Sequence, residues 1–100
     1  MERFALKSQY QVDRSMVKSW ISKTWDMLRD DPIKLAQFER DLLKLQRNLE
    51  VRPKRFGEPV DDLANLQITR CIGFTRMLIV NYGIIPQHKM VVVNMLRLRK

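Results

Sequence analysis

The chain has 100 residues, of which 45% are apolar, and this suffices for one domain, residues 1–100, with a modest hydrophobic core. It carries 19 Lys and Arg against 11 Asp and Glu, a formal net charge of +8. Cys71 is the single cysteine, which excludes an intramolecular disulfide and a cysteine-based zinc site. No apolar stretch approaches the roughly 20 residues of a membrane span, and residues 1–11 lack the apolar run of a signal peptide, so we expect a cytoplasmic protein.

Two elements are predicted near the N-terminus. Residues 1–10 alternate weakly between apolar and polar side chains, and this pattern indicates a first strand. Residues 12–28 place apolar side chains at helical spacing, with charged and polar ones on the other side, and therefore predict an amphipathic helix. Trp20 and Trp25 belong to its apolar stripe, so we expect both in the core and not on a nucleic-acid surface.

A second helix is predicted after a break at residues 30–32. Asp31 is placed to cap it, and Pro32 occupies its first position, where a missing amide hydrogen costs nothing. Because only a few residues join the two helices, we expect an antiparallel helical hairpin. The buried stripe of the second helix consists of Leu35, Phe38, Leu42, Leu45 and Leu49.

The C-terminal half predicts a loop and then three strands. Residues 52–59 contain two prolines, and we expect a connecting loop because proline lacks an amide donor and restricts the residue before it. Three β-rich runs follow, at about residues 66–72, 75–82 and 89–98, with short connections that imply antiparallel neighbours. The predicted fold class is therefore α+β in the order β-α-α-β-β-β, an antiparallel sheet covered on one face by the helical hairpin.

Charge is distributed unevenly along the chain. Residues 1–50 hold ten basic and eight acidic side chains, whereas no Asp or Glu follows Asp62. Positive charge concentrated on one part of a small domain favours encounters with phosphate backbones and gives salt-dependent binding. The cations after Asp62 are Arg70, Arg76, Lys89, Arg97, Arg99 and Lys100.

Strand alternation makes Arg70 and Arg76 the strongest candidates among these cations for a functional role. Each alternates onto the face of the apolar residues of its own predicted strand, where a charged group needs a partner or an open cleft. A bulge at Gly73 would change this parity, and an ion pair with Asp61 or Asp62 would give one of the arginines a structural role. The cations near the C-terminus also have a structural explanation, because basic residues on edge strands prevent edge-to-edge aggregation and are ordinarily solvated.

Three stretches form a set of motifs in the C-terminal half. They are Gly57-Glu58-Pro59-Val60 with Asp62-Leu63, then Arg70-Cys71-Ile72-Gly73-Phe74-Thr75-Arg76-Met77-Leu78-Ile79-Val80, and finally Ile85-Pro86-Gln87-His88-Lys89 with Met90-Val91-Val92-Val93. Together with the element order, these motifs resemble the RelE/ParE superfamily of small toxins from bacterial toxin-antitoxin systems. The resemblance covers nearly the whole chain, and the second stretch is similar to the family's Arg-x-(x)-Gly-x-x-Arg-hydrophobic hairpin.

The resemblance implies two different activities on one fold. RelE-like members cut messenger RNA at the ribosome, whereas ParE-like members inhibit DNA gyrase. RNA cleavage requires activation of a ribose 2′-hydroxyl, stabilisation of a phosphorane and protonation of the 5′-oxygen, and cations can supply the stabilisation without a metal. Arg70 and Arg76 match the family's basic hairpin positions and Arg97 lies near its basic position on the last strand, so these three are the candidate catalytic residues. The candidate RNA-binding residues are Lys54, Arg55, Lys89 and Arg99.

The chain also departs from the family pattern. Active members often place a Tyr or His near the C-terminus as a proton-transfer group, but this chain has neither in Leu98-Arg99-Lys100. Tyr82 shares a predicted strand face with Leu78 and Val80 and is better explained as a core residue, and His88 as a solvated turn residue. These residues therefore give weak support to general acid–base catalysis.

We expect the toxin component of a type II toxin-antitoxin system that acts on messenger RNA at the ribosome as a metal-independent endoribonuclease. Its expected partners are an antitoxin protein and RNA or the ribosome, with no membrane, metal or small-molecule cofactor. The alternative is a non-catalytic binding module of the same fold, either a gyrase inhibitor or an antitoxin-binding protein. A basic RNA-binding domain unrelated to toxins is a third possibility.

Overall fold

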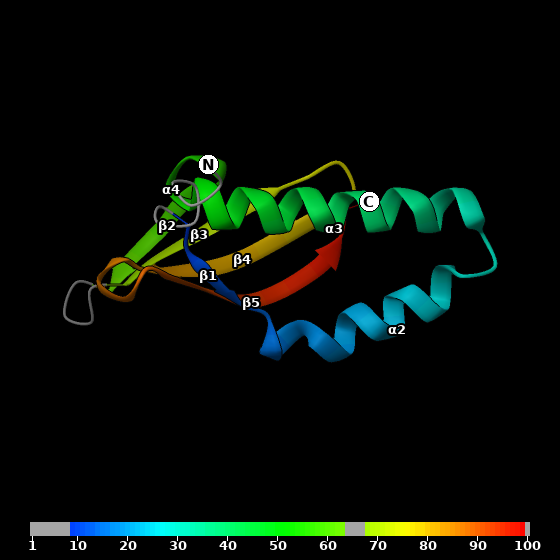
Figure 1. Ribbon diagram of the computed structural model, residues 1–100, viewed down its shortest axis with the longest axis horizontal. Helices are drawn as coiled ribbons and strands as arrows, with labels where there is room; N and C mark the ends of the chain where they lie inside the picture. The colour runs from blue at the N-terminus through cyan, green and yellow to red at the C-terminus, as the bar shows by residue number, and fades with distance from the viewer. Residues whose placement is uncertain (1–8, 64–67, 100) are drawn as a thin grey trace.

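Five strands form one mixed sheet in the computed structural model, which describes residues 9–63 and 68–99 (Figure 1). The spatial order is β1-β5-β4-β3-β2, so β1 and β2 are the edges. Neighbours from β2 to β5 pair antiparallel, whereas β1 pairs parallel with β5. The strands are β1 (Gln11–Asp13), β2 (Glu58–Leu63), β3 (Ile68–Phe74), β4 (Leu78–Ile85) and β5 (Met90–Leu98).

The helical part lies between β1 and β2 in sequence. A 3-10 turn, η1 (Ser15–Val17), leads into α2 (Lys18–Leu28), and α3 (Pro32–Val51) then runs in the opposite direction. A short helix, α4 (Pro53–Phe56), connects α3 to β2, and a second 3-10 turn, η3 (Pro86–His88), separates β4 from β5. The architecture is therefore α+β, as the sequence predicts.

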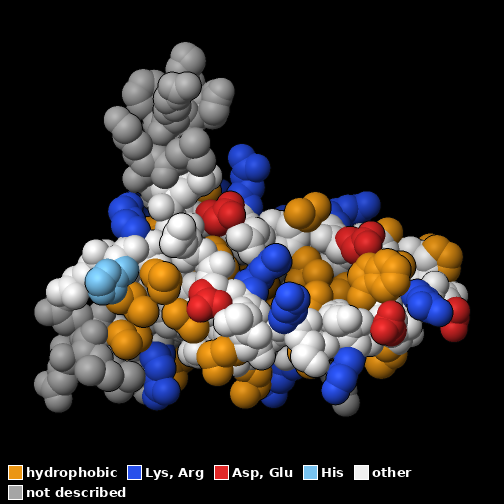
Figure 2. Space-filling model, turned by 60° about the horizontal axis from the view of Figure 1, so that its bottom comes forward, with side chains coloured by type: hydrophobic (Ala, Val, Ile, Leu, Met, Phe, Trp, Pro, Cys, Tyr) orange, Lys and Arg blue, Asp and Glu red, His pale blue; other side chains and the backbone are white. Residues whose placement is uncertain are grey.

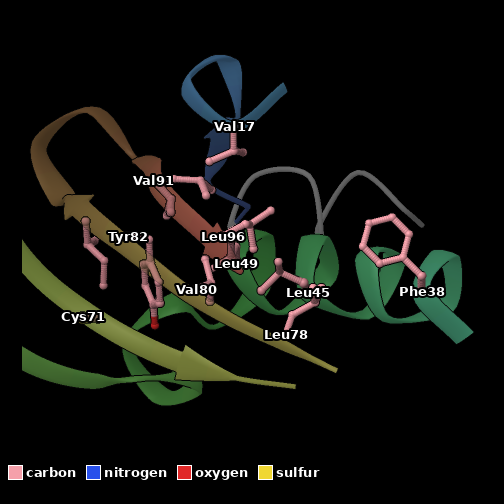
Figure 3. Packing of buried hydrophobic residues seen from close by; sticks show 12 residues of the cluster. Val17, Phe38, Leu45, Leu49, Cys71, Leu78, Val80, Tyr82, Val91 and Leu96 are labelled. Carbon is pink, nitrogen blue, oxygen red and sulfur yellow. The ribbon is translucent and has the colours of Figure 1, made fainter. Parts of the chain in front are cut away.

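The core lies between α3 and one face of the sheet (Figure 3). Phe38, Leu45 and Leu49 on α3 are almost completely buried because they recur at helical spacing and so lie on one side of the helix. Alternate residues of the strands meet them, since side chains on a strand alternate between the two faces of a sheet. The strand residues of this buried set are Cys71, Leu78, Val80, Tyr82, Ile84, Val91, Val93 and Leu96.

The predicted start of α3 is confirmed. The Asp31 carboxylate accepts a hydrogen bond from the Lys34 amide at 3.2 Å, and Pro32 occupies the first turn. This geometry supplies one of the amides at a helix N-terminus with an acceptor.

The two tryptophans of α2 have different environments. Trp20 packs against Phe38 with an edge-on geometry and a centroid separation of 6.2 Å, so its prediction as a core residue is confirmed. Trp25 is 38% exposed, and the prediction that it is buried is wrong. Its indole N–H donates to the Glu39 carboxylate at 2.9 Å and thereby joins α2 to α3.

The N-terminal predictions need correction. Residues 1–8 of the predicted first strand lie outside the described residues. The strand that the structure describes, β1, begins after the predicted strand and includes Val12 and Asp13, which the periodicity predicts as the start of a helix. The prediction of a purely antiparallel sheet is wrong, because β1 runs parallel to β5 with Val12 opposite Val91. This pairing depends on a contact between distant segments, which helical periodicity in the sequence does not reveal.

The prediction of a plain loop over residues 52–59 is also wrong. Pro53 opens α4, at a position where a helix needs no amide donor, and Glu58 begins β2. Pro59 is tolerated in β2 because this strand lies at the edge of the sheet.

The β3–β4 hairpin turns later than predicted. Gly73 and Phe74 belong to β3, and β4 begins at Leu78 instead of residue 75. Arg76 therefore lies exposed in the connecting turn and not on the face of the apolar residues of β4, so that part of the strand-parity prediction is wrong.

Two glycines of the hairpin provide a matched test of the packing. A Cβ at Gly73 would overlap the Phe56 ring, whereas a Cβ at Gly83 would meet the Ile68 side chain at 3.4 Å, an ordinary contact. Neither glycine has a positive φ, so space alone distinguishes the two sites. We expect Gly73→Ala to lower the free energy of unfolding by about 1–3 kcal/mol and Gly83→Ala to change it by less than about 1 kcal/mol. Urea unfolding measures both, and equal effects would contradict the packing of α4 on β3.

Candidate functional site

The face of β3, β4 and β5 opposite α3 is the candidate functional surface, and we call it the open face. Cys71 and Gly73 are buried on the α3 side, so Arg70 and Phe74 alternate onto the open face. The registers of β4 and β5 extend this face across the sheet. It comprises Ile68, Arg70, Ile72, Phe74, Ile79, Asn81, Gly83, Ile85, Val92, Met95 and Arg97.

Two shallow hollows of about 290 and 390 Å³ lie on the open face and share Arg70 and Asn94. Gly83 is opposite Arg70 in the β3–β4 register, and its lack of a side chain leaves room there. Asn94 is the additional residue of a β5 bulge, because Asn81 pairs with Met95 and Tyr82 with Val93. The hollows are therefore lined by a guanidinium, amides and apolar side chains.

Arg70 matches the predicted parity on the open face. It is exposed, but it already takes part in an interaction within the protein, so it is not an isolated cation. The β2–β3 register places Asp61 directly opposite it. Arg97 lies opposite Ile79, which in turn lies opposite Phe74. Along the direction of the strands, Arg70 and Arg97 are four residues apart, which corresponds to about 13 Å.

The β3–β4 turn is attached to α3 by a buried carboxylate. One oxygen of Asp41 accepts hydrogen bonds from the Thr75 hydroxyl at 2.5 Å and from the Met77 amide at 2.6 Å. The Thr75 hydroxyl in turn accepts the Leu78 amide at 3.0 Å. Asp41 lies between Phe38 and Leu45 in the apolar stripe of α3, and a carboxylate within such a stripe is a signal in the sequence for a buried polar contact of this kind.

Arg99 holds the same turn from the other side. Its Nη1 donates to the Thr75 carbonyl at 2.8 Å and its backbone amide to the Met77 carbonyl at 2.7 Å. Its guanidinium lies over the Phe74 ring, 5.4 Å from the centroid. The structure thus brings Arg76, Arg97 and Arg99 to the turn end of the sheet, and neither Arg76 nor Arg97 has an ion pair with a side chain that the structure describes.

The other predicted RNA-binding residues lie away from this end. Lys54 and Arg55 are exposed on α4, which packs on the opposite face through Phe56. Lys89 lies at the β4–β5 turn in a left-handed conformation, with its ammonium 4.8 Å from the centroid of the Tyr10 ring. These three cations therefore do not join the cluster at the turn end.

Neither suggested proton donor lies on the open face. Tyr82 is fully buried, and its hydroxyl donates to the Pro53 carbonyl at 2.6 Å, which confirms its prediction as a core residue. Burial raises the pKa of Tyr82 above its ordinary value. His88 is exposed in η3, as predicted.

The side on which α2 lies mixes apolar and basic side chains (Figure 2). Apolar side chains gather beside the pale-blue His88, and acidic ones are scattered among the basic ones.

Asp13 on β1 and Glu58 on β2 belong to the two edge strands of the sheet. The Ser15 hydroxyl and amide donate to Asp13 and lower the pKa of that carboxyl. Carboxylates therefore lie on the edge strands, while β3, β4 and β5 contain none.

Comparison with known proteins gave no match to any family model, curated protein or solved structure. Among the described residues, no three His, Cys, Asp or Glu side chains form a group suited to a metal ion. No helix in residues 9–63 and 68–99 has both the length and the apolar character needed to cross a membrane.

The Asp41 contacts predict a large effect of truncation. Asp41→Ala leaves the Thr75 hydroxyl and the Met77 amide without their acceptor, and we expect it to lower the free energy of unfolding by about 1–3 kcal/mol. Asp41→Asn retains an oxygen that can accept both bonds, so its effect should be smaller. Asp26→Ala is the control, because Asp26 is exposed and its ion pair with Arg29 is long at 3.8 Å. Chemical denaturation measures all three variants, and a neutral Asp41→Ala would contradict this role.

Tyr82→Phe tests the assignment of Tyr82 to the core. Loss of the bond to Pro53 should lower the free energy of unfolding by about 1 kcal/mol. Because the pKa of Tyr82 is raised in the folded protein, its contribution is complete below the ordinary value of 10.0 and decreases as the pH rises above it. The variant should therefore lose stability less steeply than the wild type above this pH in urea unfolding. Parallel pH profiles for the two proteins would show that the hydroxyl is not held in the core.

Proposed function

We propose that the chain is the toxin of a type II toxin-antitoxin system and that its open face binds messenger RNA at the ribosome. The observation that carries this proposal is the arrangement of Arg70, Arg97 and Arg99 on one side of a sheet whose three central strands contain no carboxylate. The α+β architecture supports it, because the resemblance to the RelE/ParE superfamily implies a sheet with a helical hairpin. Action at the ribosome places the protein in the cytoplasm.

The chemistry proposed for these cations is electrostatic. An arginine stays protonated at all physiological pH values and donates several hydrogen bonds in a fixed plane, which suits a phosphate group. Arg76 and Arg97 at the turn end would stabilise the charge that develops on the scissile phosphate, and Arg70 would hold the RNA farther along the open face. Lys54, Arg55 and Lys89 would add long-range attraction and not direct contacts.

A non-catalytic binding module is the second candidate, and one observation favours it. Tyr82 is buried on the α3 side and His88 lies in η3, at the end of the sheet away from the β3–β4 turn, so neither suggested proton donor lies beside Arg76 and Arg97. A module of this kind would inhibit gyrase or bind only its antitoxin. In either case we propose an acidic antitoxin protein as the partner that neutralises the cations.

Substitution of the arginines at the turn end tests the proposed function. We expect Arg76→Ala and Arg97→Ala each to lower message cleavage in a purified translation system by about tenfold or more, since loss of one transition-state charge contact typically costs a few kcal/mol. The matched controls are Arg40→Ala and Arg47→Ala, which remove arginines that are also exposed but lie on α3. Primer extension on the message reads out cleavage, and thermal unfolding verifies that each variant folds.

The wild-type result separates the candidates. A protein that binds RNA with a steep salt dependence but cuts no message would contradict the endoribonuclease and support a basic RNA-binding domain. A protein that neither binds RNA nor cuts a message would support the gyrase inhibitor or antitoxin-binding protein. Equal losses in the Arg76→Ala, Arg97→Ala and control variants would contradict the open face as the site. Co-expression with the product of an adjacent gene tests the toxin assignment, because a toxin that slows growth should be neutralised by its antitoxin.

A further inference from the structure

Phe74 is an exposed aromatic side chain of the open face. It is 51% exposed at the end of β3, whereas Phe38 in the core is completely buried. An exposed phenyl gains less free energy from burial than a ring in the core, and it presents a flat apolar surface to a ligand. Its neighbours on the open face at this level are Ile79 and Arg97.

The Phe74 ring is in contact with the Arg99 guanidinium, which is itself hydrogen-bonded to the β3–β4 turn. The Arg99 guanidinium lies over the ring at 5.4 Å from its centroid, within the range of a cation–π contact. Arg99 is itself anchored to the turn by two hydrogen bonds, through Nη1 and through its backbone amide. The turn is in turn fixed to α3 by Asp41. The contact between the exposed Phe74 and Arg99 side chains is thus connected through the turn and Asp41 to the core.

This arrangement combines a flat apolar surface with cations at fixed positions. Arg97 lies two strands across from Phe74 at the same level, and Arg76 follows Phe74 by two residues in the turn. A ligand that matches both features must alternate planar rings with anions, and single-stranded nucleic acid does so. An acidic peptide would pair with the cations, but it carries no regular alternation of planar rings and anions.

We propose that Phe74, with Arg99 as its positioning residue, is a stacking platform for one unpaired base of the bound RNA. This inference rests on the proposed RNA binding and adds the group that the ring recognises. Every base has a π-face, so the platform should accept all four bases with little preference. Arg97 and Arg76 would then contact the phosphates on either side of the stacked nucleotide.

An abasic probe isolates the stacking contact from the phosphate contacts. The probes are a ten-nucleotide single-stranded RNA of mixed sequence and the same oligonucleotide with abasic riboses throughout, which retains every phosphate. We expect the wild type to bind the base-containing probe roughly 5- to 150-fold more tightly, which is the effect of stacking one base on an aromatic side chain. Phe74→Leu should lose most of this difference, and Phe74→Trp should keep it. The slope of affinity against salt should be the same in all three proteins, because a phenyl ring neutralises no phosphate.

Met95→Leu is the matched control, since Met95 is an apolar side chain of the same face that is 50% exposed. It should leave the preference for the base-containing probe unchanged. If Phe74→Leu does not fold, the comparison of the two probes on the wild-type protein still tests whether bases contribute.

The outcomes separate this inference from the proposed function. No binding of either probe would overturn the proposed RNA binding itself. Equal binding of both probes by the wild type would overturn the stacking platform and leave RNA binding through phosphates intact. An equal loss of affinity for both probes in Phe74→Leu would also contradict stacking, because it would show that the ring supports the phosphate contacts. Competition by poly-glutamate that depends on Phe74 would point to an acidic protein as the occupant and would contradict the proposal.

Discussion

The arrangement of the proposed site depends on the hydrogen bonds between Asp41 on α3 and the β3–β4 turn. One Asp41 oxygen receives both the Thr75 hydroxyl and the Met77 amide, so the helix layer and the β3–β4 turn are fixed to each other. A carboxylate buried in the apolar stripe of a helix is costly unless such donors reach it. The turn must therefore adopt the conformation that supplies them. In that conformation its carbonyl groups face outward to Arg99, which packs on Phe74. The positions of Arg99 and Phe74 at the exposed turn end of the sheet therefore depend on the buried hydrogen bonds of Asp41.

The two faces of the sheet have different physical roles. The face toward α3 is filled by alternate apolar residues and by Tyr82, whose hydroxyl is satisfied by a carbonyl of α4. The other face retains a guanidinium above Gly83, amides from the β5 bulge and an exposed ring, none of which the core requires. Polar groups and exposed aromatic surface that folding does not need are the features from which we infer binding. The edge strands carry Asp13 and Glu58, whereas the three strands between them carry Arg70 and Arg97 and no acidic residue.

Much of this fold is visible in the sequence where the determinants are local. The start of α3 is predictable because Asp31 and Pro32 are a cap and a first-turn proline next to each other, and its buried stripe follows from helical periodicity. The parallel pairing of β1 is not predictable, because three residues with no local signal acquire their structure from contact with β5. The position of Asn94 depends on a bulge, and strand parity fails wherever a bulge inserts a residue. The placement of Arg76 was missed for a related reason, since a later turn removed it from the strand. Arg70 was predicted on the correct face because alternation holds on β3, whereas Arg97 on β5 was named only from the resemblance to the family.

Methyl NMR during an RNA titration tests most directly the claim that the open face is the binding surface. Both faces of the sheet carry methyl groups, so the same strands report on two sides of one layer. We predict shift changes for Ile68, Ile79, Val92 and Met95 on the open face when single-stranded RNA is added. Val80, Leu45 and Leu49, which lie between the sheet and α3, should show no comparable change. Changes confined to methyl groups of α2 and α3, with the open face unaffected, would contradict the claim.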